Sequence, residues 1–319
     1  MHEINDFALV GVVHPELGAG YDLWVGGGLS TNPRLAERLV YSSPLTLPLK
    51  YGSASPASSA TTATAACAPS TPEVPYERLG GPAKFRQILE DEYLGFKLPD
   101  GPAAPKPTAP GDHIGVHEQK DGKFFIGVTP TVGRTSGEAL VTLADTLEKH
   151  GSYRLRTTPH QKLVILDVAE EQVEPLIAEL DTLGLSARPS VFRRGTIACT
   201  GIEYCKLAIV ETKVTAATAI AELERRLVDL VETKQLPSAL SLHINGCPNS
   251  CARIQTADIG LKGMMLPTPD ATPPPPRVSR STSVAGWPTT SARKPVWDVL
   301  SAASRSRWKT CPITWSACP

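Results

Sequence analysis

The stretches ACTGIEYCKLA at residues 198–208 and NGCPNSCARIQ at 245–255 are the most informative parts of this sequence. They hold four of the chain's seven cysteines, as a C-x5-C pair and a C-x3-C pair separated by 41 residues. Four thiolates suit a zinc ion or an iron–sulfur cluster. Zinc knuckles usually have about two to four residues within a pair, whereas five residues can wrap a larger cluster. The spacing therefore predicts a four-cysteine metal site and favours iron–sulfur, with zinc or four unrelated buried thiols as alternatives. The candidate ligands are Cys199, Cys205, Cys247 and Cys251.

The second cysteine pair lies in a predicted tight turn. Gly246 and Pro248 flank Cys247 in the run Gly-Cys-Pro-Asn-Ser-Cys. Such a turn brings backbone N–H groups close to the sulfurs, where they tune the potential of a bound cluster.

A run of glycines, GGGLS at 26–30, lacks the G-x-G-x-x-G order and a P-loop lysine. It therefore indicates close backbone approach and not a nucleotide-binding loop.

Working outward from the cysteines, composition excludes several classes of function. The 319 residues include 32 basic and 32 acidic side chains, and this balance argues against a general nucleic-acid binder. No apolar run approaches the roughly 20 residues of a membrane span. The start, MHEINDFALVGVV, lacks the basic region and cleavage site of a secretory signal. Without a signal peptide, the odd cysteine count points to metal or redox chemistry. We therefore expect a cytoplasmic protein that contacts neither nucleic acid nor membrane.

Hydrophobic periodicity predicts an α+β half-domain before the cysteines. Residues 111–185 read as strand, helix, two strands and helix. Ser136 is the expected cap of the first helix, and Gly184 ends the second. The residues expected to face inward are Leu140, Leu143, Ala144 and Leu147 on the first helix, and Val173, Leu176, Ile177 and Leu180 on the second.

Two further helices are predicted outside this half-domain. One covers 81–98 and leads into a Pro-rich connector at 99–110. The other covers 213–232, and a strand at 241–245 runs directly into the second cysteine pair. The apolar stripe of the helix at 81–98 is Phe85, Ile88, Leu89 and Tyr93, and that of the helix at 213–232 is Ala219, Leu223, Leu227 and Leu230.

Two segments have the composition of disordered chain. In residues 41–72, Ser, Thr, Ala and Pro supply 24 of the 32 residues, and there is no acid. Residues 264–319 hold 10 prolines and four of the five tryptophans, with no helical or strand period. Such segments bury too little apolar surface to offset the entropy of ordering them. We expect a disordered linker and tail here.

The cysteine motif and its flanks also resemble a known family. C-x5-C followed by C-x3-C, with the second pair written GCPNSCAR, is similar to the sirohaem and 4Fe–4S motif of the ferredoxin-dependent sulfite and nitrite reductases. HIGVHEQKDGKFFIGV and LRTTPHQKLVILDV resemble the ferredoxin-like half-domain of that family, and HEINDFALVGVVHPELGAGYDLWVGGGLS resembles the end of its first half. The resemblance covers roughly residues 2–40 and 81–263.

This resemblance implies a role for individual residues. The four cysteines would hold a 4Fe–4S cluster, and the sulfur of Cys251 would also be the axial ligand of the sirohaem iron. Sirohaem carries many carboxylates, so basic side chains beside the cysteines are candidates to bind it. For each basic residue the alternative is a solvated surface position, and for Gln161 it is a strand-end hydrogen bond. Beyond Cys251, the candidate cofactor-binding residues are Gly246, Asn249, Arg253, Lys206 and Gln161. Lys162, next to Gln161, also resembles a cofactor-side position of the family.

The resemblance also predicts what the chain lacks. Family members have two similar halves around one sirohaem, and this chain opens at the tail of the first half. We therefore assign no catalytic or substrate-binding residue and expect little or no activity from the chain alone. The resemblance breaks off over the two anomalous segments, 41–80 and 264–319. Our hypothesis is that these segments are out-of-frame translation, with a genuine linker and tail as the alternative.

The predicted fold class is α+β, with a ferredoxin-like half-domain packed on a four-cysteine sirohaem and 4Fe–4S domain. The predicted function is the six-electron reduction of sulfite to sulfide or of nitrite to ammonia, with ferredoxin as electron donor. The competing hypothesis is an iron–sulfur electron carrier or binding module without catalysis. The predicted segments are a remnant of the first half at 1–40, the linker at 41–80, a helix and connector at 81–110, the half-domain at 111–185, the four-cysteine domain at 190–263 and the tail at 264–319.

Overall fold

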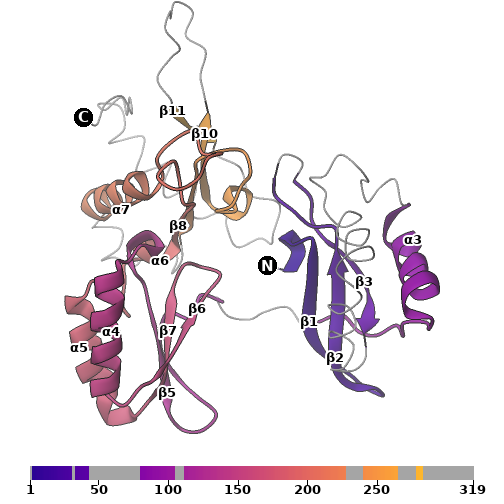
Figure 1. Ribbon diagram of the computed structural model, residues 1–319, viewed down its shortest axis with the longest axis horizontal. Coiled ribbons are helices and arrows are strands. Elements are labelled where there is room, and N and C mark those ends of the chain that lie inside the picture. The colour runs from indigo at the N-terminus through magenta and orange to yellow at the C-terminus, as the bar shows by residue number, and fades with distance from the viewer. Residues whose placement is uncertain are drawn as a thin grey trace, which may run out of the picture. The chain divides into compact units, whose positions relative to one another are not determined.

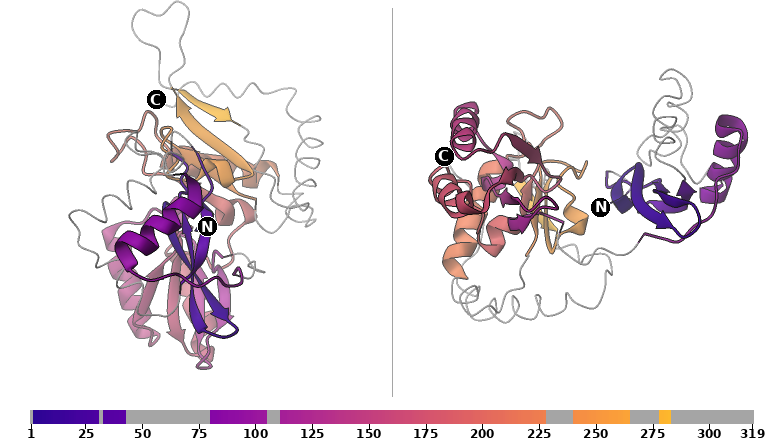
Figure 2. Two further views of the ribbon diagram at one scale, coloured as in Figure 1. Left: turned by 90° about the vertical axis from the view of Figure 1, so that its right-hand side faces the viewer. Right: turned by 90° about the horizontal axis from the view of Figure 1, so that it is seen from below.

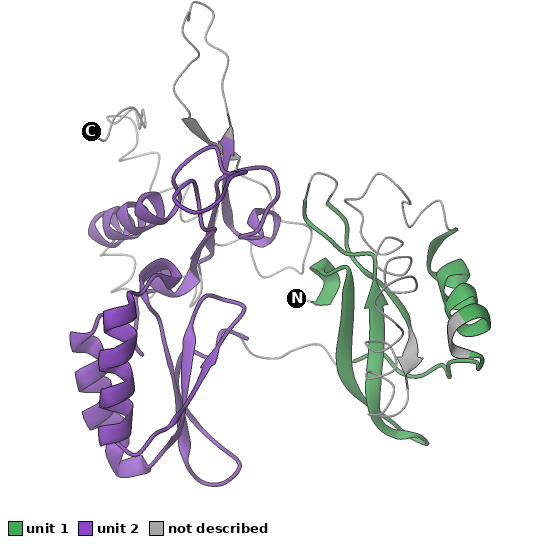
Figure 3. Cartoon of the chain, viewed as in Figure 1, with its two compact units in different colours: residues 1–109 green, residues 110–319 purple. Residues whose placement is uncertain are grey.

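The computed structural model describes residues 2–30, 33–42, 80–104, 111–227, 240–264 and 278–282. The chain forms two compact units, residues 1–109 and 110–319 (Figure 3). No helix within the described ranges has the length and hydropathy that a bilayer span requires.

The first unit is a three-stranded antiparallel sheet with a helix on one face (Figure 1). After a 3-10 turn, η1 (His2–Ile4), the strands β1 (Phe7–His14), β2 (Gly18–Val25) and β3 (Glu37–Ser42) follow in chain order. Helix α3 (Gly81–Ile88) continues as a π-helical segment, η3 (Leu89–Leu94), and ends at Gly95 with a positive φ of 71°. Apolar side chains from α3 and the sheet form the core of this unit, centred on Leu23, Val25 and Phe85.

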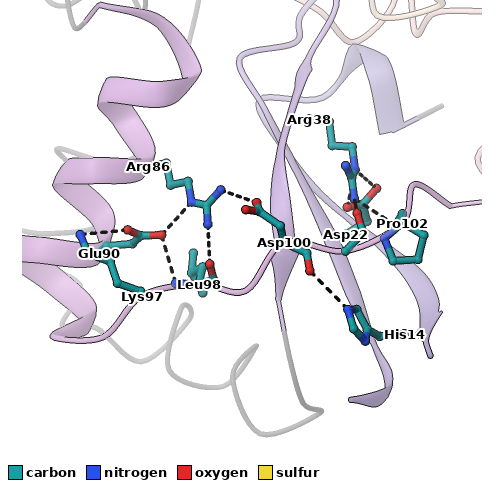
Figure 4. A network of polar contacts seen from close by, with 10 residues as sticks. His14, Asp22, Arg38, Arg86, Glu90, Lys97, Leu98, Asp100 and Pro102 are labelled. Atoms are coloured by element: carbon teal, nitrogen blue, oxygen red, sulfur yellow. Dashed lines mark hydrogen bonds and ion pairs between the residues drawn. The ribbon is translucent and has the colours of Figure 1, made fainter. Parts of the chain in front are cut away.

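Ion pairs hold the Pro-rich connector against this unit (Figure 4). The buried carboxylate of Asp22 accepts from Arg38 Nε at 2.7 Å, and Arg38 Nη2 donates to the carbonyls of Gly101 and Pro102 at 2.6 and 2.9 Å. Arg86 on α3 similarly donates to Asp100 Oδ1 at 2.6 Å. The connector is therefore fixed by side chains from both the sheet and the helix.

The first part of the second unit is a four-stranded antiparallel sheet of order β4-β5-β7-β6. Its strands are β4 (Gly115–Glu118), β5 (Phe124–Val128), β6 (Arg154–Thr157) and β7 (Leu163–Val168). A short turn, η4 (Thr131–Gly133), leads to helix α4 (Gly137–Lys149), and η5 (Glu170–Gln172) leads to α5 (Val173–Thr182). Both helices cover one face of the sheet (Figures 1 and 2). The α+β half-domain predicted from the sequence is present, but it has one more strand than predicted, because β4 precedes β5.

The second part of this unit contains the cysteines. It is a sheet of order β11-β10-β9-β8, in which β8, β9 and β10 are parallel and β11 is antiparallel. The strands are β8 (Thr196–Ala198), β9 (Leu242–Asn245), β10 (Ile259–Met264) and β11 (Val278–Thr282). The helices are α6 (Val191–Gly195), α7 (Lys213–Arg226) and the short η6 (Ile254–Thr256).

The predicted helix faces agree with the structure to different degrees. All four predicted positions of α5 are buried, and the Ser136 hydroxyl caps α4 by accepting from Ala139 N at 3.1 Å. On α4, however, Leu140 and Ala144 are exposed, because the helix turns only Leu143 and Leu147 toward the sheet. On α7 the fully buried positions are Ala216 and Ile220, with the predicted Ala219 and Leu223 beside them. The side chain of Tyr93 and the whole of Leu230 lie outside the part of the chain that the structure describes.

The tail prediction needs one correction. Within 264–319 the structure describes a strand, β11, whose Val278 and Thr282 lie opposite Met264 and Gly260 of β10. The sequence shows no clear strand period there, and the strand forms because the edge of β10 offers unpaired backbone groups. Most of the predicted linker and tail, and with it the out-of-frame hypothesis, concerns residues outside the described ranges.

Candidate metal centre

The two cysteine loops leave the same edge of the parallel sheet. Cys199 follows β8 directly, and Cys247 comes two residues after β9. In this register Ala198 lies opposite Ile244, and the Cys199 N–H donates to the Ile244 carbonyl at 2.9 Å. Because parallel strands end at a common edge, the loops emerge together. Open sheets with parallel strands commonly bind ligands at this edge.

Close backbone contacts join the two loops. The N–H of Ile209 donates to the Gly246 carbonyl at 2.7 Å, and the N–H of Gly246 donates to Cys199 Sγ at 3.1 Å. A Cβ atom on Gly246 would lie only 3.0 Å from Ala208 Cβ. Glycine therefore allows the second loop to approach the first closely enough for an N–H···S hydrogen bond.

The turn after Cys199 also depends on a glycine. Gly201 has a φ of +75°, and a Cβ there would lie 2.6 Å from Thr212 Oγ1. Thr212 is fully buried, and its hydroxyl donates to the Cys199 carbonyl at 2.6 Å. Any other residue at position 201 would meet both the backbone strain and this hydroxyl.

The turn that carries Cys251 contains two left-handed residues that are not glycine. Ser250 and Arg253 have φ values of 59° and 57°. The turn is closed by Arg253 N donating to the Ser250 carbonyl at 2.8 Å, and by Ala252 N donating to Asn245 Oδ1 at 2.7 Å. Cys251 is thereby left exposed at the surface of the turn.

The thiol of Cys251 lies within electrostatic range of the other three cysteines. The pKa of Cys251 is raised, first by burial and then by the charges of Cys199, Cys247 and Cys205. Within the described ranges, no three His, Cys, Asp or Glu side chains converge on a position for a single ion. Four thiolates are a donor set that suits a zinc ion or a 4Fe–4S cluster.

Two of the other predicted site residues bind the protein backbone. Arg253 Nη2 donates to the Pro159 carbonyl at 2.9 Å, in the turn between β6 and β7, and burial lowers the pKa of Arg253. Gln161, in the same turn, donates from Nε2 to the Ala198 carbonyl at 2.6 Å, and its Oε1 accepts from Ala198 N at 3.2 Å. The amide of Gln161 thus pairs with Ala198 at the end of β8, 37 residues away in the sequence.

The remaining predicted residues lie at the surface of the cysteine loops. Lys206, which follows Cys205, and Asn249, which precedes Ser250, are both exposed. Both side chains are therefore accessible from solvent, next to cysteines in the sequence.

Two lysines that were not assigned a contact in the sequence lie behind the cysteine loops. Lys213 Nζ donates to the carbonyls of Val132 and Ala198 at 2.6 and 2.9 Å. Lys162 is 1% exposed, its Nζ donates to the Thr196 carbonyl at 3.4 Å, and burial lowers its pKa to about 8. Lys213 carried one sequence signal: it is a cation in the first turn of α7, where the helix dipole disfavours positive charge.

Comparison with known proteins identifies part of the second unit. Residues 117–183 match the family model described as the nitrite/sulfite reductase ferredoxin-like half domain. The α+β fold therefore contains this half-domain, and the chain is similar to ferredoxin-dependent sulfite and nitrite reductases.

Individual relatives are similar over most of this chain. Sulfite reductase [ferredoxin] 1 of Mycolicibacterium paratuberculosis is 48% identical over 283 residues, which cover 85% of this chain and 48% of that protein. The assimilatory ferredoxin-dependent nitrite reductase of Haloferax mediterranei is 37% identical over 195 residues, covering 58% of this chain and 33% of its own. The structure of the Mycobacterium tuberculosis NirA protein aligns with a TM-score of 0.75 and 45% identity, covering 88% of this chain and 50% of that one. The chain thus spans about half the length of the mycobacterial relatives that it matches.

Proposed function

We propose that this chain supplies the cluster-binding part of a ferredoxin-dependent sulfite or nitrite reductase. Cys199, Cys205, Cys247 and Cys251 would hold a 4Fe–4S cluster, and Cys251 would also help to hold a sirohaem. The observation that carries the proposal is the meeting of both cysteine loops at one sheet edge, with the Gly246 N–H donating to Cys199 Sγ at 3.1 Å.

Reduction of sulfite to sulfide, or of nitrite to ammonia, needs six electrons, and ferredoxin delivers electrons one at a time. The cluster would supply one-electron transfer, and sirohaem would supply the position where the anion is reduced. Cys251 is classed as exposed, which suits a residue that would contact a second group. The Gly246 N–H stabilises negative charge on the Cys199 sulfur, as hydrogen bonds to cluster sulfurs generally do.

Exposed polar groups next to the cysteines in sequence would be available to such a cofactor. Lys206 and Asn249 are accessible from solvent and can hydrogen-bond carboxylates there. Arg253 and Gln161 would instead act mainly through the backbone, since their side chains bind the Pro159 and Ala198 carbonyls. Sulfite and nitrite require the same number of electrons, so the substrate proposal includes both anions.

Anaerobic reconstitution tests this proposal. The reduced chain would be incubated with iron and sulfide, and its iron, acid-labile sulfide and electron paramagnetic resonance spectrum measured. Four irons and four sulfides per chain are expected, against a single zinc in a structural zinc domain. Sirohaem would then be added and its visible bands recorded. A cluster with no sirohaem bands would support an electron carrier without catalysis, and no iron uptake would refute the proposal.

A further inference from the structure

The peptide directly before the first cysteine ligand is held by two side chains that are distant in sequence. The Ala198 carbonyl accepts from Gln161 Nε2 at 2.6 Å and from Lys213 Nζ at 2.9 Å. Ala198 N donates to Gln161 Oε1 at 3.2 Å, so that the amide of Gln161 pairs with both backbone groups of this residue. Ala198 is completely buried, so these side chains take the place of water as its partners.

Gln161 reaches Ala198 because its own loop is built for close approach. It has a φ of 58°, which a non-glycine residue rarely adopts. It packs on Gly133, where an added Cβ would lie 2.6 Å from Gln161 Cβ. Val132, next to this glycine, is also left-handed with a φ of 51°, and its carbonyl accepts from Lys213. Gln161 of the ferredoxin-like half-domain therefore binds the segment that leads to Cys199 directly, and Val132 binds the Lys213 side chain that also contacts this segment.

Lys213 contributes charge as well as hydrogen bonds. Lys213 Nζ donates to the carbonyl of Ala198, the residue directly before Cys199. Burial lowers the pKa of Lys213, and Cys199 acts to raise it. The position of Lys213 in the first turn of α7 is unfavourable for a cation. The hydrogen bonds to the Val132 and Ala198 carbonyls offset this cost.

We propose that Lys213 and Gln161 are positioning residues that fix the Cys199 segment for cluster binding, and that the Lys213 ammonium raises the midpoint potential of the bound cluster. The positioning role concerns the protein alone. The effect on potential rests on the function proposed above, because it requires the cluster. A positive charge beside a cluster thiolate stabilises the reduced state, which carries one more negative charge.

Hydrogen–deuterium exchange of the full chain without cofactors tests the positioning role. In Lys213→Met the Ala198 carbonyl loses a charged donor, and exchange at the peptide containing Cys199 N should accelerate about tenfold or more. Lys213→Arg should restore slow exchange. Lys149→Met is the matched control, because it removes an exposed helical lysine of the same unit that pairs with Glu179. Equal exchange in Lys213→Met and Lys149→Met would overturn the positioning role.

Gln161→Asn provides a second, independent variant. Asparagine tolerates the left-handed backbone but is one methylene too short to reach Ala198. Accelerated exchange at the Cys199 peptide is expected here also, and wild-type exchange would count against Gln161. This variant decides the positioning role if Lys213→Met fails to fold, as judged by circular dichroism.

The midpoint potential of the reconstituted cluster tests the charge. Lys213→Met should shift the potential to a more negative value, while Lys213→Arg and Lys149→Met should leave it near that of the wild type. An unchanged potential in Lys213→Met would overturn the electrostatic role, even if exchange is faster. A wild-type chain that takes up no cluster would refute the proposed function and the electrostatic role with it, whereas the exchange data would still decide the positioning role.

Discussion

Replacing Asp112 by asparagine should destabilise the second unit, because this carboxylate anchors the helix that precedes the first cysteine. Arg194, on α6, donates to Asp112 from Nε at 2.6 Å and from Nη2 at 2.9 Å. Helix α6 runs directly into β8, which ends one residue before Cys199. Asparagine keeps the size of the side chain but removes the charge and one of the two acceptors.

The expected cost follows from burial and geometry. Breaking a buried ion pair typically costs about 3–5 kcal/mol, because one charge remains without its partner. The side chain of Asp112 is 12% exposed, but that of Arg194 is 26% exposed, so water can partly solvate the orphaned guanidinium. After this discount we expect Asp112→Asn to lower the free energy of unfolding by roughly 2–3 kcal/mol.

The acid dependence of stability gives a second readout. Although burial acts to raise it, the hydrogen bonds and charge of Arg194 hold the pKa of Asp112 below its usual 3.8. Between the two pKa values the unfolded chain binds more protons, so acid favours unfolding. The stabilisation by Asp112 is therefore present above about pH 4 and is lost as the pH falls through the folded pKa. Asp112→Asn should lack this part of the acid dependence.

Urea unfolding followed by far-ultraviolet circular dichroism measures both effects. Glu174→Gln is the control, because Glu174 pairs with Arg188 and both side chains are mostly exposed. That variant should change stability little, since exposed pairs contribute little. A loss of less than about 0.5 kcal/mol in Asp112→Asn, or one equal to that of the control, would refute the anchoring role.

Three further outcomes are expected. Cys251→Ser should alter the visible spectrum of added sirohaem even where some cluster remains, whereas Cys199→Ser should affect the cluster alone; equal sirohaem spectra would contradict the bridging assignment. Gly133→Ala should lower the free energy of unfolding by roughly 1–3 kcal/mol, because the residue has a φ of 67° and the new Cβ would lie 2.6 Å from Gln161 Cβ. Chemical denaturation that shows no loss would contradict this contact. The pKa of Lys162 is lowered to about 8 from 10.5, so the unfolded chain binds more protons than the folded chain between these pH values. The free energy of unfolding should therefore rise by roughly 3 kcal/mol from pH 8 to pH 10.5, and Lys162→Met should abolish this rise in unfolding experiments.

Local patterns in the sequence predict some elements of this fold accurately. Helix α5 has an uninterrupted apolar stripe and a stop at Gly184, and all four of its predicted core positions are buried. The stripe of α7 was less decisive, because small and β-branched residues occur around the helix. The sheet beneath it determines which of them are covered, so Ala216 and Ile220 become the centre of the contact. Strand β11 was not predicted, since its pairing depends on an available edge of β10.

The same distinction applies to the candidate site. The spacing of the cysteines predicts a shared site, and the electrostatic influence of the other three on Cys251 is in accord with it. The contacts of Gln161 and Lys213 could not be predicted, because Gln161 lies 37 residues from Ala198 and Lys213 lies 81 residues from Val132. Only the folded sheet brings such distant positions together.

Backbone strain around the cysteine loops supports a preorganised site. Val132, Gln161 and Arg253 all have positive φ values, and each is held by a contact to another segment. Val132 accepts from Lys213, Gln161 pairs with Ala198, and Arg253 donates to Pro159. Left-handed backbone at such residues persists only where the surroundings impose it, and it is often found at functional sites. Contacts within this chain therefore hold all three left-handed residues in place: the Lys213 ammonium on Val132, the Ala198 backbone on Gln161 and the Pro159 carbonyl on Arg253.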